Sequence, residues 1–271
     1  MTVQPECSRY DPAGRRLDPA HGLIERRGGR GRGVEDGEGR HRVGFAGQCE
    51  HDVRGPIGRD QRDDAFPARE DRRVNDVERV LRGPVLEVAP TMLGWSLSHD
   101  TSDGRVTVRL TEVEAYAGAA DPASHAARGR TLRTEVMFGP PARLYVYFSY
   151  GMHWCANVVV GPAGEASAVL LRAGRVVDGV DLARARRPPG TPERSLARGP
   201  ACLTQALGIS RVHNGADLRG ASALVLMPGE RAVDVSAGAR VGVSLAAGVP
   251  WRFWVTGDET VSAYKRSPRA P

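Results

Sequence analysis

An alternation of apolar and polar residues in the middle of the chain predicts a pair of strands. Residues 144–160 read LYVYFSYGMHWCANVVV, with two β-prone segments on either side of Gly151. Strand geometry places Tyr145 and Tyr147 on one face, opposite Val146, Phe148 and Tyr150. The pattern predicts a hairpin with a ring-lined face. Such a face is typical of an ordinary aromatic core, and also of a surface that stacks an unpaired nucleobase.

A second alternating segment, DGRVTVRLTEVEAY at residues 103–116, predicts a strand that follows a hairpin turn at Asp103-Gly104. One face of this strand begins with aliphatic residues and continues into Glu112, Glu114 and Tyr116. Carboxylates on the buried side of a strand cost free energy unless a partner compensates them or a reaction uses them. A bulge that turns them to solvent is the alternative.

The remaining pattern favours an α+β fold with more strands than helices. Helices are expected in three places: ahead of Gly94, in the segment DLARARR before Pro188, and at residues 199–207, where Gly-Pro starts the helix. Short strands are expected at Ala168–Leu171, ending in Arg172, and in ALVLMPG, ARVGVSLAAG and PWRFWVTG. We therefore predict a single domain over residues 80–265, built on a curved, mostly antiparallel sheet with flanking helices.

Residues 1–79 differ from the rest of the chain. They are rich in Arg, Gly and Asp, and their few aliphatic residues follow neither the helical nor the strand period. This stretch is predicted to be a disordered extension, because it offers too little apolar surface to offset the entropy of the chain. A misassigned translation start is the other interpretation. Its 16 arginines balance 16 acidic residues, so the net charge of +6 lies entirely in the remainder.

Composition narrows the class of protein. The excess of basic over acidic residues favours an anionic binding partner. The four cysteines form no CxxC pair, which argues against a zinc site or a disulfide framework. No apolar run approaches the roughly 20 residues of a membrane span, and the N-terminus lacks the core of a signal peptide. A soluble, intracellular and cytoplasmic protein is expected.

The candidate chemistry combines an acidic residue at the end of a strand, a basic loop with His125, a stacking hairpin and Arg172. Together they suit hydrolysis of the glycosidic bond of a base that has been extruded from a duplex. Lys265 is the only lysine in the chain and lies far along the sequence from these residues. No lysine is therefore expected near the site, and water rather than a Schiff-base amine is the expected nucleophile.

Four segments resemble the alkyladenine (3-methyladenine) DNA glycosylase family: TEVEAYAGAADPASH, MFGPPARLYVYFSYGMHWCANVV, SAVLLRAG and RGPACLTQALGI. They follow the family's order, and the resemblance extends from about Val85 to Val261. It implies base-excision repair of alkylated or deaminated purines in duplex DNA, such as 3-methyladenine, 7-methylguanine and hypoxanthine. It also implies an abasic product without strand cleavage, and neither a metal nor an organic cofactor. We expect a monomer.

The resemblance also implies a role for each site residue. Glu114 would be the general base that activates water, and Arg172 would help to hold that water and the carboxylate. Three residues would wall the pocket and stack on the extruded base, namely Tyr116, His125 and Tyr147. Tyr150 would insert into the duplex, and Asn157 would lie on the pocket floor and disfavour guanine.

Two other functions stay open from the sequence. A nucleosidase could use Glu112 and Glu114 as an acid and base pair, although residues two apart on a strand point the same way and that chemistry needs carboxylates on opposite sides of the bond. A non-catalytic module that binds damaged DNA would keep Tyr116, Tyr147 and Tyr150 but would not need Glu114.

Overall fold

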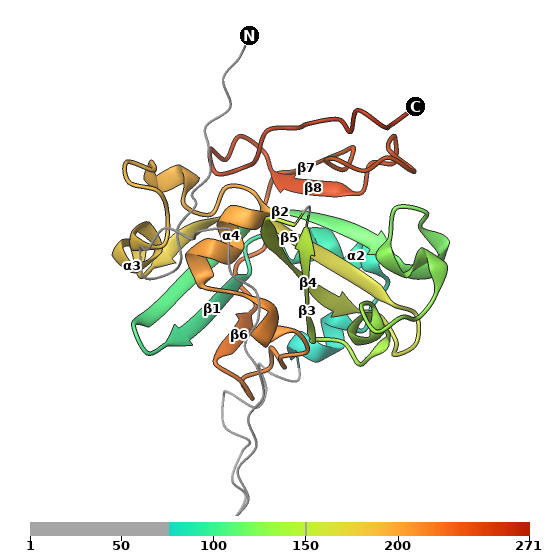
Figure 1. The fold of residues 1–271 in the computed structure, drawn as a ribbon, viewed down its shortest axis with the longest axis horizontal. Helices are drawn as coiled ribbons and strands as arrows, with labels where there is room; N and C mark the ends of the chain where they lie inside the picture. The colour runs from blue at the N-terminus through green and yellow to red at the C-terminus, as the bar shows by residue number, and fades with distance from the viewer. Residues whose placement is uncertain (1–75, 150) are drawn as a thin grey trace, which may run out of the picture. The chain divides into compact units, whose positions relative to one another are not determined.

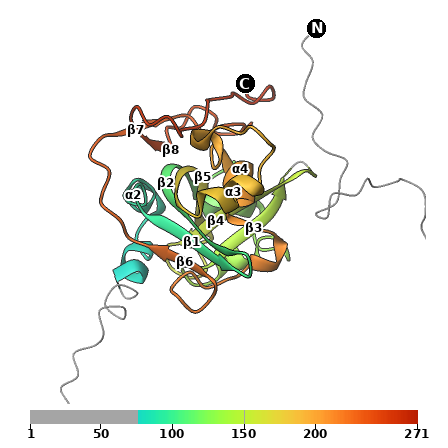
Figure 2. The same cartoon turned by 90° about the vertical axis from the view of Figure 1, so that its left-hand side faces the viewer.

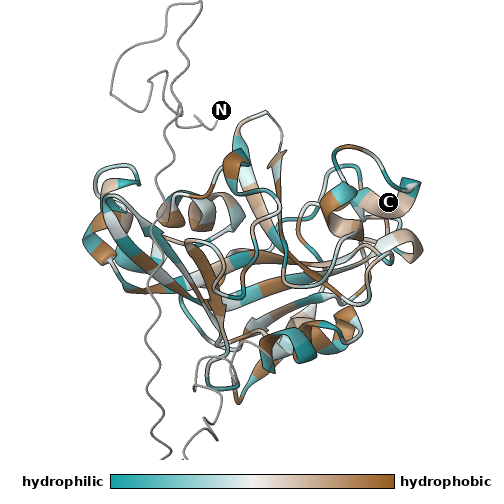
Figure 3. Cartoon of the chain, turned by 90° about the horizontal axis from the view of Figure 1, so that it is seen from below, coloured by the Kyte–Doolittle hydropathy of each residue, from teal (hydrophilic) through white to brown (hydrophobic). Residues whose placement is uncertain are grey.

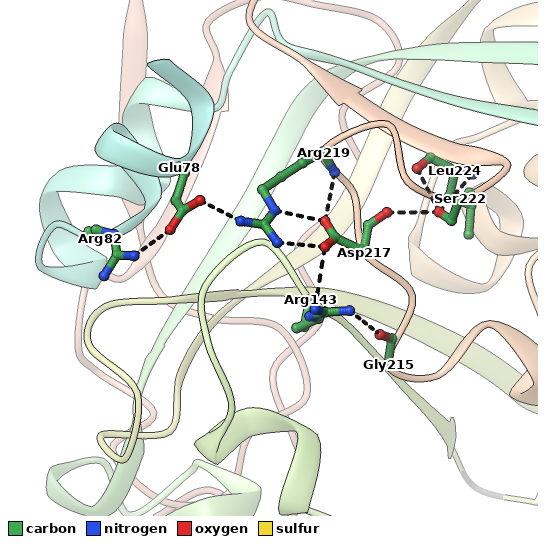
Figure 4. A network of polar contacts seen from close by, with 8 residues as sticks. All are labelled: Glu78, Arg82, Arg143, Gly215, Asp217, Arg219, Ser222 and Leu224. Atoms are coloured by element: carbon green, nitrogen blue, oxygen red, sulfur yellow. Dashed lines mark hydrogen bonds and ion pairs between the residues drawn. The ribbon is translucent and has the colours of Figure 1, made fainter. Parts of the chain in front are cut away.

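The computed structural model describes residues 76–149 and 151–271. Residues 1–75 of the N-terminal extension predicted over residues 1–79, and Tyr150, lie outside the described residues. The first described residues, 76–81, are helical, and four of them precede the predicted domain boundary at residue 80. Val77 and Leu81 of this helix are buried in the main core. Glu78 contacts Arg82 and Arg219, and Arg219 in turn pairs with Asp217 (Figure 4).

An eight-stranded sheet forms the centre of the fold (Figure 1). Its main path runs in the order β3-β4-β5-β2-β1-β6, while β8 also pairs with β2 and carries β7 on its other edge. Every strand pairing is antiparallel, which confirms the predicted class of sheet. The strands are β1 Ser96–Thr101, β2 Gly104–Ala117, β3 Leu144–Ser149, β4 His153–Val160, β5 Ser167–Asp178, β6 Leu224–Met227, β7 Val235–Gly238 and β8 Arg252–Val255.

Among the described residues, strands outnumber α-helices, as the pattern predicted. Besides the helical residues 76–81, the α-helices are α2 Val85–Thr91, α3 Val180–Ala185 and α4 Pro200–Leu207. In α4, Pro200 starts the helix and Gly208 ends it in the left-handed conformation at φ 68°. Helices α2 and α4 lie on opposite sides of the central strands β2 and β5 (Figure 2). Apolar residues recur along the strands between them (Figure 3), and the core is built from both helices and these strands.

Both sequence-predicted hairpins are confirmed. Strands β1 and β2 pair from Thr101 opposite Gly104, which sits at φ 125° where glycine is favoured. Strands β3 and β4 pair from Leu144 opposite Val158 to Ser149 opposite His153. The two faces of the β3–β4 hairpin also pack as expected. Val146 is part of the main hydrophobic core, whereas Tyr145 belongs to a second hydrophobic cluster, against which Tyr147 packs.

One predicted strand is wrong. The segment ARVGVSLAAG at residues 239–248 contains no strand, and the strand in this region is β7, which ends just before it. The physical reason is that the backbone of this segment bonds elsewhere. The amide of Val241 donates to the Glu114 carboxylate at 2.7 Å, and the amide of Gly242 donates to the carbonyl of Lys265 at 3.0 Å. Gly242 also adopts φ 72°, outside the strand region.

Candidate active site

A cavity of about 880 Å³ lies where the sheet meets two long connecting segments. One wall comes from the ends of β2 and β3, from β4 and β5, and from the loop after β2. The other wall comes from residues 241–245 and 265–269. The lining includes most of the residues singled out from the sequence, namely Tyr116, His125, Tyr147, Asn157 and Arg172.

Strand register explains why these side chains meet. Cα partners in adjacent antiparallel strands point to the same side of the sheet. Tyr145 on β3 lies opposite Asn157 on β4, Asn157 lies opposite Leu170 on β5, and Leu170 lies opposite Glu114 on β2. Because the first three line the cavity, Glu114 points to the same side of the sheet. The register thus directs a carboxylate from the central strand toward the ring-lined wall.

Glu114 is fully buried, and three groups of the cavity wall hold its carboxylate. Oε1 accepts a hydrogen bond from the amide of Val241 at 2.7 Å and lies 3.2 Å from Nη1 of Arg172. Oε2 accepts a hydrogen bond from the hydroxyl of Tyr116 at 2.9 Å. Burial, followed by the charge of Glu114, raises the pKa of Tyr116 well above its usual value, so this hydroxyl remains a donor.

Glu112 is just as buried but belongs to a different network. Its Oε1 accepts from Nε of Arg172 at 2.8 Å, from Nε of Arg252 at 2.7 Å and from the hydroxyl of Ser262 at 3.0 Å. Its Oε2 accepts from the amide of Ser262 at 2.7 Å. The register of β2 against β5 shifts around Glu112, but the irregularity leaves both carboxylates inside the protein. The expectation of costly buried carboxylates is therefore confirmed, and partners compensate both.

The aromatic wall is made of rings that contact one another. The rings of Tyr145 and Tyr147 stack with centroids 5.7 Å apart, and the ring of His125 meets Tyr147 edge-on at 4.5 Å. Nδ1 of His125 lies 3.1 Å from the Tyr145 hydroxyl, and the guanidinium of Arg133 lies 5.5 Å from the Tyr147 ring centroid. His125 is exposed at the rim, yet loss of ring hydration and then the charge of Arg133 lower the pKa of its imidazole to about 4. The imidazole is therefore neutral at pH 7.

Asn157 lines the cavity and is almost completely buried. Its Nδ2 donates to the carbonyl of Tyr145 at 3.1 Å, which fixes the orientation of the amide. Phe148, which alternation assigned to the opposite hairpin face, also reaches the lining, because it is partly exposed at the outer end of β3.

Sequence reasoning missed a buried ion pair between two residues that are adjacent in sequence to the cavity lining. Arg240 and Asp121 have fully buried side chains, and Nη2 of Arg240 donates to Asp121 at 2.9 Å. The same guanidinium lies 4.7 Å from the ring centroid of Tyr116. Arg240 thus supports Tyr116, and the next residue, Val241, holds Glu114. Nothing in the sequence marked this position, because Arg240 sits in a segment with the alternation of an ordinary strand.

The position of Lys265 contradicts the expectation from the sequence. Lys265 lines the cavity, together with Arg266 and Arg269, so the expectation that no lysine lies near the site is wrong. Distance along the sequence misled here, because the carbonyl of Lys265 accepts a hydrogen bond from Gly242, a residue of the same wall.

The structure does not describe Tyr150, the residue expected to insert into DNA. Its neighbours show where the hairpin turns: β3 ends at Ser149, β4 begins at His153, and Gly151 has φ 67°. Met152 beside it is 65% exposed. The predicted role of Tyr150 stays a prediction.

A comparison with protein families decides the class of this site. The family model described as methylpurine-DNA glycosylase matches residues 79–259, which include both carboxylates and every described residue of the aromatic wall. This chain belongs to the methylpurine-DNA glycosylase family. It is therefore a DNA glycosylase, an enzyme of DNA base-excision repair.

Individual relatives agree with this membership. A protein of Leifsonia xyli subsp. xyli is 51% identical over 191 residues, which cover 68% of this chain and 89% of the relative. One from Streptomyces avermitilis is also 51% identical, over 69% of this chain and 90% of its own length. One from Burkholderia lata is 49% identical over 65% of this chain and 85% of its length. Each carries the name "Putative 3-methyladenine DNA glycosylase".

Two further observations concern the part of this glycosylase that the structure describes. Within residues 76–149 and 151–271, no group of three or more His, Cys, Asp or Glu side chains is placed to hold a metal ion. Across the same residues, no helix combines the length and apolarity needed to cross a bilayer.

Proposed function

We propose that this glycosylase releases 3-methyladenine and related purines, including 7-methylguanine and hypoxanthine, from duplex DNA by hydrolysis of the N-glycosidic bond. The observation that carries the proposal is the Glu114 carboxylate, aimed from β2 toward a ring-lined cavity and held by groups of its wall. The names of the relatives support 3-methyladenine as the first substrate to test.

Glu114 is proposed to orient and deprotonate the attacking water. An ionised carboxylate has about four lone-pair positions. Three are used by Tyr116, Val241 and Arg172, and Oε2 accepts only the bond from Tyr116 among the described residues. One position on Oε2 therefore remains for a water proton. The negative charge also stabilises the sugar cation that develops as the base departs.

The rings of Tyr116 and Tyr147, with His125 at the rim, are proposed to hold the extruded base. N-alkylation gives a purine a positive charge, and a cation is attracted to the electron-rich face of a tyrosine. The cavity is large enough for a purine, and Asn157 presents a fixed amide to the edge of the base. Tyr150, which follows β3 in the sequence, is proposed to aid extrusion by filling the gap left in the duplex.

The alternative that pairs Glu112 with Glu114 as acid and base has less support. Glu112 accepts three of its four bonds from Arg252 and Ser262, which lie outside the cavity lining, whereas the partners of Glu114 all line the cavity. Residues two apart on β2 also share one side of the sheet.

Incubation of the full chain with alkylated duplex DNA tests the proposal. Free methylated purine and abasic sites are expected, without strand breaks. Glu114→Gln should slow base release by about 10²- to 10⁴-fold, the usual contribution of a general base, while affinity for the lesion duplex changes only several-fold. Glu87→Gln, an exposed carboxylate on α2, is the matched control and should act as wild type. Normal base release by Glu114→Gln would refute the role of Glu114.

A second variant tests base extrusion independently of bond hydrolysis. Tyr150→Ser should weaken binding to duplex DNA and lower excision from duplexes more than excision from single strands. If wild type and variant act equally on duplex and single strands, Tyr150 does not fill the gap.

A further inference from the structure

Part of the second wall of the cavity, residues 265–269, lies beyond the match to the family, which ends at residue 259. Residues 262–269, here called the strap, carry Lys265, Arg266 and Arg269 into the lining. We infer that the strap binds backbone phosphates of the DNA strand at the mouth of the cavity, through Lys265 and Arg269. This inference rests on the proposed function and adds to it a set of contacts that positions the lesion strand.

The strap has little regular secondary structure, yet its backbone is fixed at two points. At Ser262, the amide and hydroxyl both donate to Glu112, and the carbonyl accepts from Nη2 of Arg252 at 2.9 Å. At Lys265, the carbonyl accepts from the amide of Gly242 at 3.0 Å. A backbone held in this way presents its side chains at a defined place without using them for its own stability.

The charges of the strap are available to a ligand. Lys265 and Arg269 are exposed, and among the described residues no carboxylate lies within ion-pair distance of either. The guanidinium of Arg266 contacts the main-chain oxygen of Pro271, so the argument does not depend on it. No Asp or Glu occurs among the described lining residues, and Arg133 adds a cation on the aromatic side. The mouth of the cavity is therefore positively charged on both sides.

The chemistry of the ligand follows from this charge. A methylated purine is itself a cation, so Lys265 and Arg269 repel the base and do not bind it. Phosphates of the same strand are anions and flank the extruded nucleotide on both sides. Exposed lysine and arginine side chains are the usual partners of backbone phosphates, and each such contact releases condensed counterions. The strap therefore contributes affinity that depends on salt and not on the lesion.

The test measures the salt dependence of DNA binding in the Glu114→Gln background, where base release does not interfere. Fluorescence anisotropy with duplex DNA, from 50 to 300 mM salt, gives the slope of log K against log salt. Each lost phosphate contact reduces the slope by about 0.9. Lys265→Ala/Arg269→Ala should therefore reduce it by about 1.8, and weaken binding at 0.1 M salt on the order of 10-fold or more.

Two control variants test whether the change in slope is specific to the charges of the strap. Arg194→Ala/Arg231→Ala removes two exposed cations that do not line the cavity, and it should leave the slope closer to wild type than the strap variant does. Lys265→Arg/Arg269→Lys keeps the charges and should restore the slope. An unchanged slope in the strap variant, or an equal loss in the Arg194/Arg231 control, would overturn the inference.

A final experiment tests whether Lys265 binds phosphate or acts as a nucleophile that forms an imine. Wild type is mixed with abasic duplex and sodium borohydride, which reduces any imine between an amine and the C1′ aldehyde to a stable adduct. No adduct is expected. An adduct in wild type that is missing in Lys265→Ala would make Lys265 a nucleophile and overturn its phosphate role. Absence of base release by wild type, with the slope change intact, would instead refute the proposed function alone.

Discussion

Strand β2 carries two carboxylates, two residues apart, and each is the centre of a polar network with different partners. Glu112 and Glu114 are equally buried, and Arg172 contacts both. Glu112 accepts four bonds, three of them from Arg252 and Ser262 outside the cavity lining. Glu114 accepts from Tyr116 and Val241 and contacts Arg172, three groups that line the cavity.

The difference teaches that two equally buried carboxylates on one strand can be held by different partners. Arg172, Arg252 and Ser262 donate to Glu112, so this residue links β2, β5, β8 and the strap. The partners of Glu114 all line the cavity, and this is the carboxylate proposed to react. Burial alone would raise the pKa of Glu112, but Arg172, Ser262 and Arg252 reverse this effect and the pKa is lowered. Glu112 is therefore ionised at pH 7.

The same substitution should lower the stability of the protein much more at Glu112 than at Glu114. Glu112→Gln places an amide NH₂ among groups that donate, and it leaves the buried guanidinium of Arg252 without a carboxylate. We expect the free energy of unfolding to fall by about 3–5 kcal/mol, the usual cost of breaking a buried ion pair. Glu114→Gln keeps an oxygen for the Val241 amide and places its NH₂ beside a hydroxyl that can accept. Its stability should fall by less than about 1.5 kcal/mol. Urea unfolding measures both.

The pH dependence of stability tests whether Glu112 is ionised in the folded protein. Because the pKa of Glu112 is lowered in the folded protein, its contribution is fully present above the unfolded-state pKa of about 4.3 and is lost as pH falls through the folded-state pKa. The stability difference between wild type and Glu112→Gln should thus shrink below about pH 4. A difference that stays constant into strong acid would contradict the ionised state of Glu112.

A smaller change tests the Glu114 network. Tyr116→Phe keeps the ring that lines the cavity but removes the hydroxyl that donates to Oε2 of Glu114. The carboxylate then loses one of the contacts that orient it, and a hydrogen bond to a charged group is worth about 1.5–3 kcal/mol. We expect single-turnover base release to slow by about 10-fold, with binding of the lesion duplex nearly unchanged. A large loss of binding with normal release would show that the ring, not the hydroxyl, is what matters.

The sequence predicted the half of the site that comes from local pattern. Period-2 alternation placed Glu112 and Glu114 on the inner side of β2, and both are fully buried. It also placed Tyr145 and Tyr147 on one hairpin face, and both line the cavity. These residues could be found because a strand fixes the direction of its side chains from one position to the next.

The other half depends on contacts between segments far apart in the chain. Val241 reaches Glu114 across 127 positions, and Arg240 reaches Asp121 across 119. The alternation of Val241, Val243 and Leu245 predicted a strand, but its amides bond to a carboxylate and to the strap. No local pattern reports such a partner. The different roles of Glu112 and Glu114 were hidden for the same reason, because the donors to Glu112 lie at Arg252 and Ser262.

The least disruptive test of the Glu112 network is Ser262→Ala. The hydroxyl donates to Oε1 of Glu112 at 3.0 Å and lies 3.3 Å from Nη2 of Arg172, but the Ser262 amide still donates to Oε2 after the change. Loss of a typical hydrogen bond lowers the free energy of unfolding by about 0.5–1.5 kcal/mol. The main-chain contact should keep the strap in place, so the salt slope of DNA binding should stay that of wild type. A variant of normal stability with a reduced slope would mean that the hydroxyl positions the strap, and that Glu112 acts on DNA binding more than on folding.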